Sequence, residues 1–200
     1  MARYTGPTNK LYRNYGVKDL SNRKLTTSMR STASGQHGAM RKKASDYALQ
    51  LKAKQTIRMT YLVSEKQFAK YYETASRKTG VTGTIMLQML ESRLDNVLYK
   101  AGFAITRRQA RQIVNHAHIL VNGKKVDVPS YLLKEGDVVT VRESSKQFIK
   151  NVIEQIDLAL AYAWLTVDKN ELKITFERIP QREELDPEFK EQLVIEYYSK

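Results

Sequence analysis

The chain has 200 residues, which is enough for one or two domains with hydrophobic cores of their own. It carries 34 Lys and Arg against 21 Asp and Glu, a formal net charge of +13, and it contains no cysteine. This composition favours a polyanionic partner and excludes disulfides and cysteine-based zinc sites. No stretch has the apolar character of a membrane-spanning helix or a signal peptide, so we expect a cytoplasmic protein without a membrane partner.

The charge is distributed unevenly along the chain. Residues 1–60 contain 13 Lys and Arg against two acids, Asp19 and Asp46, which gives a local net charge of +11. Residues 143–200 contain 8 basic and 12 acidic residues, a local net charge of −4. Because basic residues neutralise phosphates, we expect the N-terminal part to bind a nucleic acid and the C-terminal part to face protein or solvent.

Residues 1–43 offer little material for a hydrophobic core. Ser, Thr, Gly and basic residues dominate, with Tyr4, Tyr12 and Tyr15 between them. This composition is typical of a segment that is disordered alone and ordered on RNA, where Lys and Arg bind phosphates and aromatic rings stack on bases. The sequence therefore predicts a basic RNA-binding extension.

The pattern from Ser45 onward predicts helices. Ser45 begins a helix that runs to about Leu62, and the basic side of this helix includes Lys54 and Arg58.

Ser64 and Gln67 have the spacing of a capping box, which predicts a second helix. Its aromatic residues recur at helical spacing, so we assign them to the core. We expect Gly80 and Gly83 to break this helix and another to begin at Thr84–Leu90.

Two further helices are predicted between residues 90 and 117. The first has apolar residues at helical spacing as far as Ala101 and ends at Gly102. Thr106 and Gln109 form a capping box that begins the second. The side of this helix that lies off its apolar stripe carries long hydrogen-bonding side chains. They are Arg107, Arg108, Arg111, Gln112, Asn115 and His116.

The period then changes from helical to alternating. Residues 119–121 alternate, Asn122-Gly123 is the strongest short signal for a hairpin, and residues 126–128 resume the alternation. A further strand is predicted at Val138–Val141. Lys124 and Lys125 lie at the hairpin tip.

The cationic helix side and the two hairpin lysines together suggest a nucleic-acid platform. The alternative is that the arginines form only a solvated face. We favour the platform because no carboxylate lies three or four residues from Arg107, Arg108 or Arg111 to pair with them. His116 and His118 are expected on opposite sides of a strand, so the sequence predicts no metal site and no cofactor.

The remaining chain predicts a helix at Phe148–Ala161 and strands at Trp164–Val167 and Leu172–Ile179. Asp186-Pro187 is a signal for a helix start, and the closing LVIEYYSK is expected to be a strand or an extended segment.

Several of these segments resemble one family. The sequences RLDNVLYKAGF, TRRQARQIVNHAHILVNGKKVDVPSY and GDVV resemble the S-four RNA-binding domain. The sequences MARYTGP, GQHG, SDYALQL, FERIPQREELDPE and EQLVIEYYSK resemble the bacterial ribosomal protein S-four family, so the likeness covers essentially the whole chain in the order of that family.

The resemblance implies an α+β fold with four parts. Residues 1–43 would form the basic RNA-binding extension, and residues 44–90 a helical subdomain completed by the C-terminal segment. Residues 91–145 would form the S-four domain, with two helices packed on a small antiparallel sheet. Residues 146–200 would form a helix and strand segment that packs on the helical subdomain.

The resemblance also implies a structural constituent of the small ribosomal subunit and no catalysis. Such a protein would be a primary binder of the 5′ domain of 16S rRNA, would nucleate assembly of the subunit body, and would contribute to translational accuracy near the channel where mRNA enters. Its expected partners are 16S rRNA, the ribosomal proteins S-five and S-three, and nearby mRNA. No homo-oligomer is expected.

The expected RNA-binding residues combine the basic extension, the helical subdomain and the platform. They are Arg3, Tyr4, Lys10, Arg13, Gln36, His37, Arg41, Lys42, Lys43, Lys54, Arg58, Arg107, Arg108, Arg111, Gln112, Asn115, His116, Lys124 and Lys125.

The chief alternative is an rRNA-modifying pseudouridine synthase, a family that also uses an Arg-Leu-Asp signature, here Arg93-Leu94-Asp95. Against it, Asp95 falls early in a predicted helix, where an acid stabilises the helix dipole by roughly 0.3–1 kcal/mol, and no separate catalytic domain remains. A synthetase is also disfavoured, because the sequence contains no ATP-binding signature. A small ribosome-rescue RNA binder leaves residues 1–90 unexplained.

Overall fold

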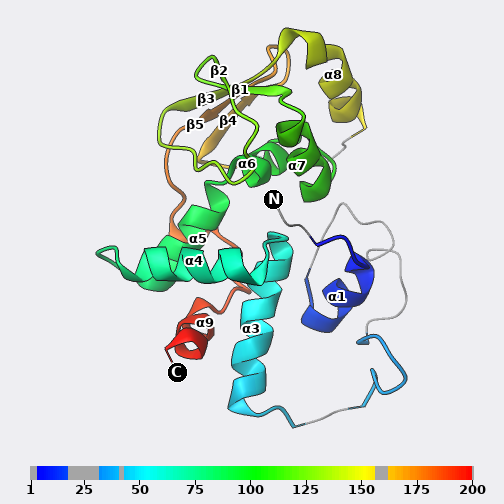
Figure 1. Ribbon diagram of the computed structural model, residues 1–200, viewed down its shortest axis with the longest axis vertical. Helices are drawn as coiled ribbons and strands as arrows, with labels where there is room; N and C mark the ends of the chain where they lie inside the picture. The colour runs from blue at the N-terminus through cyan, green and yellow to red at the C-terminus, as the bar shows by residue number, and fades with distance from the viewer. Residues whose placement is uncertain (1–3, 18–31, 41–42, 156–161, 200) are drawn as a thin grey trace. The chain divides into compact units, whose positions relative to one another are not determined.

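The structure is a computed structural model that describes residues 4–17, 32–40, 43–155 and 162–199 (Figure 1). These ranges contain α-helices and one five-stranded antiparallel sheet, which confirms the predicted α+β class. The chain divides into two compact units. The central unit comprises Gln88–Glu184, and the terminal unit combines the residues up to Leu87 with those from Leu185 onward. None of the helices in the described ranges has both the length and the apolar character needed to cross a membrane.

The central unit is built on the antiparallel sheet, whose strand order is β2-β1-β3-β5-β4. Its strands are β1 (Ile119–Val121), β2 (Lys124–Lys125), β3 (Asp137–Val141), β4 (Leu165–Asp168) and β5 (Lys173–Phe176). Within the sheet, Ile119 lies opposite Val141, and Val139 lies opposite Ile174. The buried positions of neighbouring strands therefore fall in register on one face.

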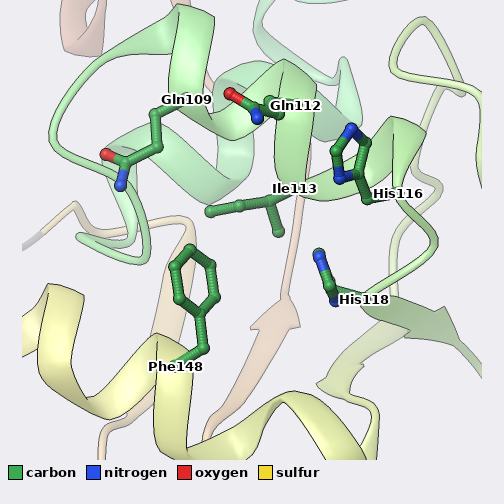
Figure 2. Close-up of a pocket in the computed structure, with 6 residues that line it drawn as sticks. All are labelled: Gln109, Gln112, Ile113, His116, His118 and Phe148. Atoms are coloured by element: carbon green, nitrogen blue, oxygen red, sulfur yellow. The ribbon is translucent and has the colours of Figure 1, made fainter.

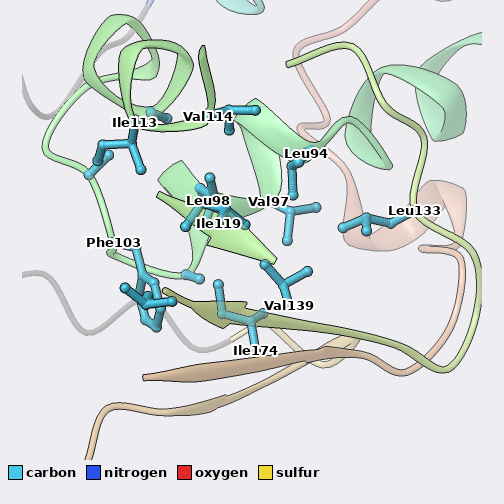
Figure 3. Close-up of a cluster of buried hydrophobic side chains, with 14 of the residues drawn as sticks. Leu94, Val97, Leu98, Phe103, Ile113, Val114, Ile119, Leu133, Val139 and Ile174 are labelled. Carbon is cyan, nitrogen blue, oxygen red and sulfur yellow. The ribbon is translucent and has the colours of Figure 1, made fainter. Parts of the chain in front are cut away.

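Helices α6 (Leu94–Lys100) and α7 (Arg107–Asn115) pack against this sheet. Their apolar side chains and those of strands β1, β3, β4 and β5 meet in one hydrophobic cluster (Figure 3). The members labelled in the figure are Leu94, Val97, Leu98, Phe103, Ile113, Val114, Ile119, Leu133, Val139 and Ile174. The unit also contains α8 (Lys146–Glu154) and the short 3-10 helices η1 (Glu143–Ser145) and η2 (Arg182–Glu184). Two helices on a small antiparallel sheet were predicted, and the structure confirms this arrangement.

The predicted hairpin at Asn122-Gly123 is present, but its second strand is shorter than expected. Both turn residues have positive φ, 50° at Asn122 and 76° at Gly123, as a tight two-residue hairpin turn requires. Strand β2 ends at Lys125, and the amide of Val126 makes one further bond across to the carbonyl of Ile119 at 3.4 Å before the chain leaves the sheet. The chain instead turns toward α6, where the carbonyl of Pro129 accepts a hydrogen bond from the amide of Asp95 at 3.2 Å. Satisfying these free helix-start amides replaces further strand pairing.

The predicted segment 146–200 is divided between the two units. Strand β5 pairs with β3, and β4 pairs with β5, so both strands extend the central sheet. Leu172, Ile174 and Phe176 alternate along the chain, and all three are fully buried in the central cluster. Only the residues from Leu185 onward belong to the terminal unit, so the expected boundary at residues 145 and 146 does not separate the two units.

The terminal unit is helical. Its helices are α1 (Thr8–Tyr15), α3 (Asp46–Thr60), α4 (Glu65–Ser76), α9 (Glu191–Tyr198) and the first part of α5 (Thr82–Glu91). Helix α3 packs against both α1 and α9. The Ser45 hydroxyl accepts a hydrogen bond from the amide of Ala48 at 3.3 Å, which confirms the predicted start of α3. Ser64 is the N-cap of α4, but its hydroxyl makes no capping bond, so the predicted reciprocal capping box is wrong.

Gly83 does not break a helix as predicted, because it lies inside α5. A Cβ atom built on Gly83 would lie 2.6 Å from Cγ of Glu191 at the start of α9. The position needs glycine for close approach of two helices, not for a turn.

The C-terminal segment is a helix, so the predicted strand is wrong. β-branched and aromatic residues favour strands in isolation, but the rings of α9 pack on other helices of its unit. The ring centroid of Tyr198 lies 4.7 Å from that of Tyr72 and 6.3 Å from that of Phe68. The predicted helix start at Asp186-Pro187 is also wrong. Oδ1 of Asp186 accepts a hydrogen bond from the amide of Glu188 at 2.9 Å and so closes a turn.

Candidate nucleic-acid interface

The start of α7 is determined by the predicted capping pair. The Thr106 hydroxyl accepts a hydrogen bond from the amide of Gln109 at 3.1 Å, and Oε1 of Gln109 accepts one from the amide of Ile105 at 2.8 Å. The glutamine therefore reaches one residue further back than a standard capping box. Together with the buried residues Ile113 and Val114, these bonds determine which side of α7 faces outward.

The outward side of α7 carries hydrogen-bond donors and no acid. Arg108, Gln112 and Asn115 are spaced at i, i+4 and i+7, and all three are exposed. His116, the C-cap residue, is exposed beside them. Four of the six predicted residues of this helix therefore lie on an accessible surface.

Arg111 is not part of that surface. Its guanidinium is buried and binds Asp95 of α6, with Nε and Nη2 at 3.0 and 2.7 Å from Oδ2. Arg93 binds the same carboxylate, with Nε at 3.0 Å from Oδ1 and Nη2 at 2.8 Å from Oδ2. The exposed fractions of these side chains are 9% for Arg111, 3% for Asp95 and 1% for Arg93. The expected free arginine is therefore a buried structural residue.

The burial of Asp95 also changes the expected cost of losing it. A helix-dipole contribution of roughly 0.3–1 kcal/mol applies to an exposed acid in the first turn. A buried carboxylate that binds two guanidinium groups is different, because its removal breaks two buried ion pairs at once.

Arg107 is intermediate between the exposed Arg108 and the buried Arg111. Its side chain is half-buried, Nε donates to Oδ1 of Asn96 at 3.0 Å, and the guanidinium lies 4.3 Å from the ring centroid of Tyr99. Asn96 in turn donates to Oε2 of Glu91 at 2.6 Å. This chain of contacts holds Arg107 at the first turn of α7, next to the exposed Arg108.

The hairpin tip presents the two predicted lysines. Lys124 and Lys125 form β2 and are exposed. The tip is braced because the side chain of Asn122 accepts a hydrogen bond from the amide of Val138 at 2.9 Å and donates to Oδ1 of Asp137 at 2.8 Å. The lysines therefore project from a rigid turn.

A pocket of about 320 Å³ opens beside the C-terminal half of α7 (Figure 2). Its walls come from α7 and its C-cap, from His118 just before β1, and from α8. The lining residues are Gln109, Gln112, Ile113, His116, His118 and Phe148. Nδ1 of His118 lies 2.7 Å from the hydroxyl of Ser145. Burial lowers the pKa of His118 below its usual value, and the charges of His116 and Arg142 act in the same direction.

The predicted geometry of the two histidines is wrong, because neither lies in a strand. His116 ends α7, His118 precedes β1, and their ring centroids are 5.9 Å apart. The part of the chain that the structure describes contains no group of three or more His, Asp or Glu side chains suited to a metal ion.

Two basic residues predicted to bind RNA from the terminal unit point into its interior. Lys54 is buried, with Nζ 2.7 Å from Oε1 of Glu65 and 4.3 Å from the ring centroid of Tyr197. Nε of Arg58 donates to Oε1 of Gln55 at 2.8 Å and lies 3.4 Å from Oε2 of Glu65. The predicted basic side of α3 is therefore partly neutralised by α4.

The predicted residues of the N-terminal extension are only partly described. Arg13 donates two hydrogen bonds to the carbonyl of Thr32, at 2.8 and 3.1 Å, and Nδ1 of His37 lies 3.2 Å from Sδ of Met40. The described members other than Arg13 are exposed; they are Tyr4, Lys10, Gln36, His37 and Lys43. Arg3, Arg41 and Lys42 lie outside the described residues.

Sequence reasoning missed His118 and Phe148 as members of this surface. The sequence did contain a signal for Phe148. It is next to Ile149 but lies off the apolar face of the predicted helix, which indicates an exposed aromatic ring. In the structure Ile149 is buried and Phe148 is 48% exposed.

Comparison with known proteins assigns both parts of the chain. Residues 3–91 match the family described as the ribosomal protein S4/S9 N-terminal domain, and residues 92–139 match the S4 domain. The chain is 51% identical to the small ribosomal subunit protein uS4A of Symbiobacterium thermophilum over 208 aligned positions that cover all of both chains.

Other relatives give the same result. The chain is 48% identical to uS4 of Mesomycoplasma hyopneumoniae and 46% identical to uS4 of Herpetosiphon aurantiacus, again over the full length of each. These matches decide against the enzyme alternatives, because uS4 proteins are structural. The chain belongs to the uS4 family of small ribosomal subunit proteins.

Proposed function

We propose that this protein is a structural component of the small ribosomal subunit and binds 16S rRNA through the outward side of α7 and the hairpin tip. One observation carries this proposal: Arg108, Gln112 and Asn115 are all exposed on one side of α7, and that side contains no acidic residue. Membership of the uS4 family supports the ribosomal setting.

The chemistry of this surface suits an RNA backbone. An exposed guanidinium binds phosphate as a charged, multiple donor, while Gln112 and Asn115 add neutral donors and acceptors for phosphate, ribose or base edges. Lys124 and Lys125 add two positive charges in the same unit. Phosphate contacts of this kind position an RNA and make binding dependent on salt.

The proposal extends to the target and to assembly. Residues 1–60, with a net charge of +11, would bind the 5′ domain of 16S rRNA, and early binding there would nucleate assembly of the subunit body. In this proposal residues 1–43 form the extension, which is anchored where α1 packs against α3 of the terminal unit.

The acidic C-terminal part suggests protein partners instead. Residues 143–200 have a net charge of −4, which disfavours phosphate contact. We propose that this part contributes to contacts with ribosomal proteins S-five and S-three near the channel where mRNA enters. Contacts at that place would give the protein its influence on translational accuracy.

Filter binding to a transcript of the 5′ domain of 16S rRNA tests the central claim. The wild type should bind tightly at low salt and lose affinity steeply between about 50 and 200 mM salt. The double variant Arg108→Ala/Gln112→Ala should bind more weakly at every salt concentration. Lys169→Ala is the matched control, because Lys169 is an exposed cation at the β4–β5 turn, and it should bind like the wild type. Wild-type affinity that does not respond to salt would refute the proposal.

A further inference from the structure

The pocket beside α7 combines aromatic, amide and apolar groups in a way that phosphate binding does not require (Figure 2). Phe148 of α8 lies across the pocket from α7 and is 48% exposed. The exposed half of this ring is accessible to a ligand that enters the pocket, and an aromatic face offers such a ligand a stacking surface. No described residue that lines the pocket is acidic.

The rings form a continuous wall. The ring centroids of His116 and His118 are 5.9 Å apart, and those of His118 and Phe148 are 5.8 Å apart. The buried side chain of Ile113 forms the apolar floor, and the amide of the exposed Gln112 lies at the opposite rim. A flat ligand with hydrogen-bonding edges fits this combination better than a purely apolar one. Small-molecule pockets begin at about 300 Å³, so a volume of about 320 Å³ suits a single planar group.

Single-stranded RNA supplies such groups. Unpaired bases splay out of loops and bulges, stack on aromatic side chains, and form hydrogen bonds along their edges. The phosphates on either side of such a base would meet the donors of α7, because Gln112 and His116 belong both to the pocket lining and to the exposed side of that helix. The pocket and the phosphate surface are therefore continuous.

We propose that this pocket receives one unpaired nucleobase of the bound rRNA, which stacks on Phe148 and forms a hydrogen bond with the amide of Gln112. The inference rests on the proposed function, since it assigns a base-reading element to the same RNA surface. It changes the role of the surface from positioning a backbone to selecting a particular unpaired nucleotide.

The test compares four proteins on the transcript of the 5′ domain. They are the wild type, Phe148→Leu, Phe148→Tyr and the control Tyr131→Leu, which alters a 37% exposed aromatic residue of the same unit outside the pocket. Loss of one stacked base weakens binding by about 5- to 150-fold, so Phe148→Leu should show a loss in this range. Phe148→Tyr keeps the ring, and it should bind within about twofold of the wild type, as should Tyr131→Leu. The slope of log affinity against log salt should not change, because no charge is removed.

Abasic substitutions in the RNA identify the base without altering the protein. One unpaired position should weaken the wild type when its base is removed, and removing the same base should have little further effect on Phe148→Leu. Such non-additivity would show that the base and the ring interact directly.

Three results would overturn the inference. If the wild type binds the transcript and Phe148→Leu binds equally well, the pocket is not a base site, while the proposed function remains. If Phe148→Leu binds naked RNA normally but fails to enter reconstituted subunits, a side chain of a neighbouring protein occupies the pocket instead. If the wild type does not bind the transcript, the proposed function and this inference both fail.

Discussion

Asp95, Arg93 and Arg111 form a buried cluster in which one carboxylate serves two guanidinium groups. The net charge of the three side chains is positive, so the carboxylate is the member that the cluster cannot lose without leaving two like charges together. Asp95 therefore has a structural role: it stabilises the fold.

We predict that Asp95→Asn lowers the free energy of unfolding by about 3–5 kcal/mol, because it removes the charged partner that binds two buried guanidinium groups. Urea unfolding followed by circular dichroism measures the loss. Asp127→Asn is the control, because Asp127 is exposed in the same unit, and its effect should stay within about 0.5 kcal/mol. A loss for Asp95→Asn as small as that of the control would mean that the cluster is not formed in solution.

Arg108 and Arg111 should separate RNA binding from stability. We predict that Arg111→Ala destabilises the fold, by less than Asp95→Asn, because Asp95 keeps Arg93 as a partner. Arg108→Ala should leave the unfolding midpoint unchanged and weaken rRNA binding, because Arg108 is exposed. Denaturant titration and filter binding of both variants provide the comparison. If Arg111→Ala unfolds at the wild-type midpoint but loses RNA affinity, Arg111 must bind RNA after all.

Glu65 should make the terminal unit sensitive to acid. Burial acts to raise the pKa of Glu65, but hydrogen bonds from Lys54 and Tyr198, together with the charges of Lys54 and Arg58, hold it below 4.5. A carboxyl with a lower pKa when folded adds stability that is complete above its unfolded value and is lost as the pH falls.

We therefore predict that Glu65→Gln is less stable than the wild type at neutral pH and that this difference disappears below pH 4.5, as wild-type Glu65 takes up its proton. Denaturant unfolding at a series of pH values provides the measurement. A difference between the two proteins that is independent of pH would show that the carboxylate is not the stabilising group.

The residue scale also shows a limit of sequence reasoning. Arg107, Arg108 and Arg111 looked equivalent because no carboxylate lies within four residues of any of them. The carboxylate that binds Arg111 lies sixteen positions earlier in the chain. Local spacing predicts partners within one helix, whereas a contact between two helices depends on how they pack. The sequence placed Arg108 correctly on an exposed side, but it did not distinguish Arg108 from its buried neighbour.

At the scale of elements, the β1–β2 hairpin provides a rigid mount for two charges. We predict that Lys124→Ala/Lys125→Ala reduces the slope of log affinity against log salt by about 1 to 2, because each lost phosphate contact removes roughly 0.7 to 0.9 from that slope. Filter binding across a salt series measures the slope. Lys169 lies at the turn between β4 and β5, and β4 is the edge strand opposite β2. Lys169→Ala should therefore leave the slope unchanged. An unchanged slope for the double variant would remove the hairpin from the interface.

Elements with local start signals were predictable, and elements set by tertiary contacts were not. Ser45 and Thr106 cap their helices with their own hydroxyls, so a few neighbouring residues were enough to place α3 and α7. Helix α9 has a strand-like composition, and its helical state depends on aromatic contacts with distant helices. Strand β2 ends early for a similar reason, because the following backbone bonds to α6.

At the scale of the whole molecule, the charge gradient along the chain should be visible in how it contacts RNA. Residues 177–196 contain seven acids and three basic residues, whereas residues 1–60 contain two acids and thirteen basic residues. We predict that ultraviolet cross-links to rRNA, mapped by mass spectrometry in reconstituted subunits, concentrate in residues 1–60 and in α7 and are sparse in residues 177–196. Cross-links centred on residues 177–196 would contradict the proposed division between RNA-facing and protein-facing parts.

The sequence supported the family and the fold class of the whole chain, but it did not reveal how the chain is divided. The boundary between Leu87 and Gln88 falls inside the continuous helix α5, where composition gives no sign of a linker. The second boundary, at Leu185, follows β4 and β5, which complete a sheet begun by β1 at Ile119. Compact units are defined by contacts between segments that are far apart in sequence, and local sequence patterns do not reveal these contacts.

The two outer strands of the central sheet are short, and this has a consequence for the protein before it meets RNA. An exposed strand edge offers unpaired backbone groups that can template association with another chain. Here one edge, β2, has only two residues, both lysines, and the other, β4, has four. The same lysines that are proposed to bind phosphate therefore also discourage edge-to-edge aggregation. Short, charged edges of this kind disfavour pairing of the sheet with a second copy of the chain.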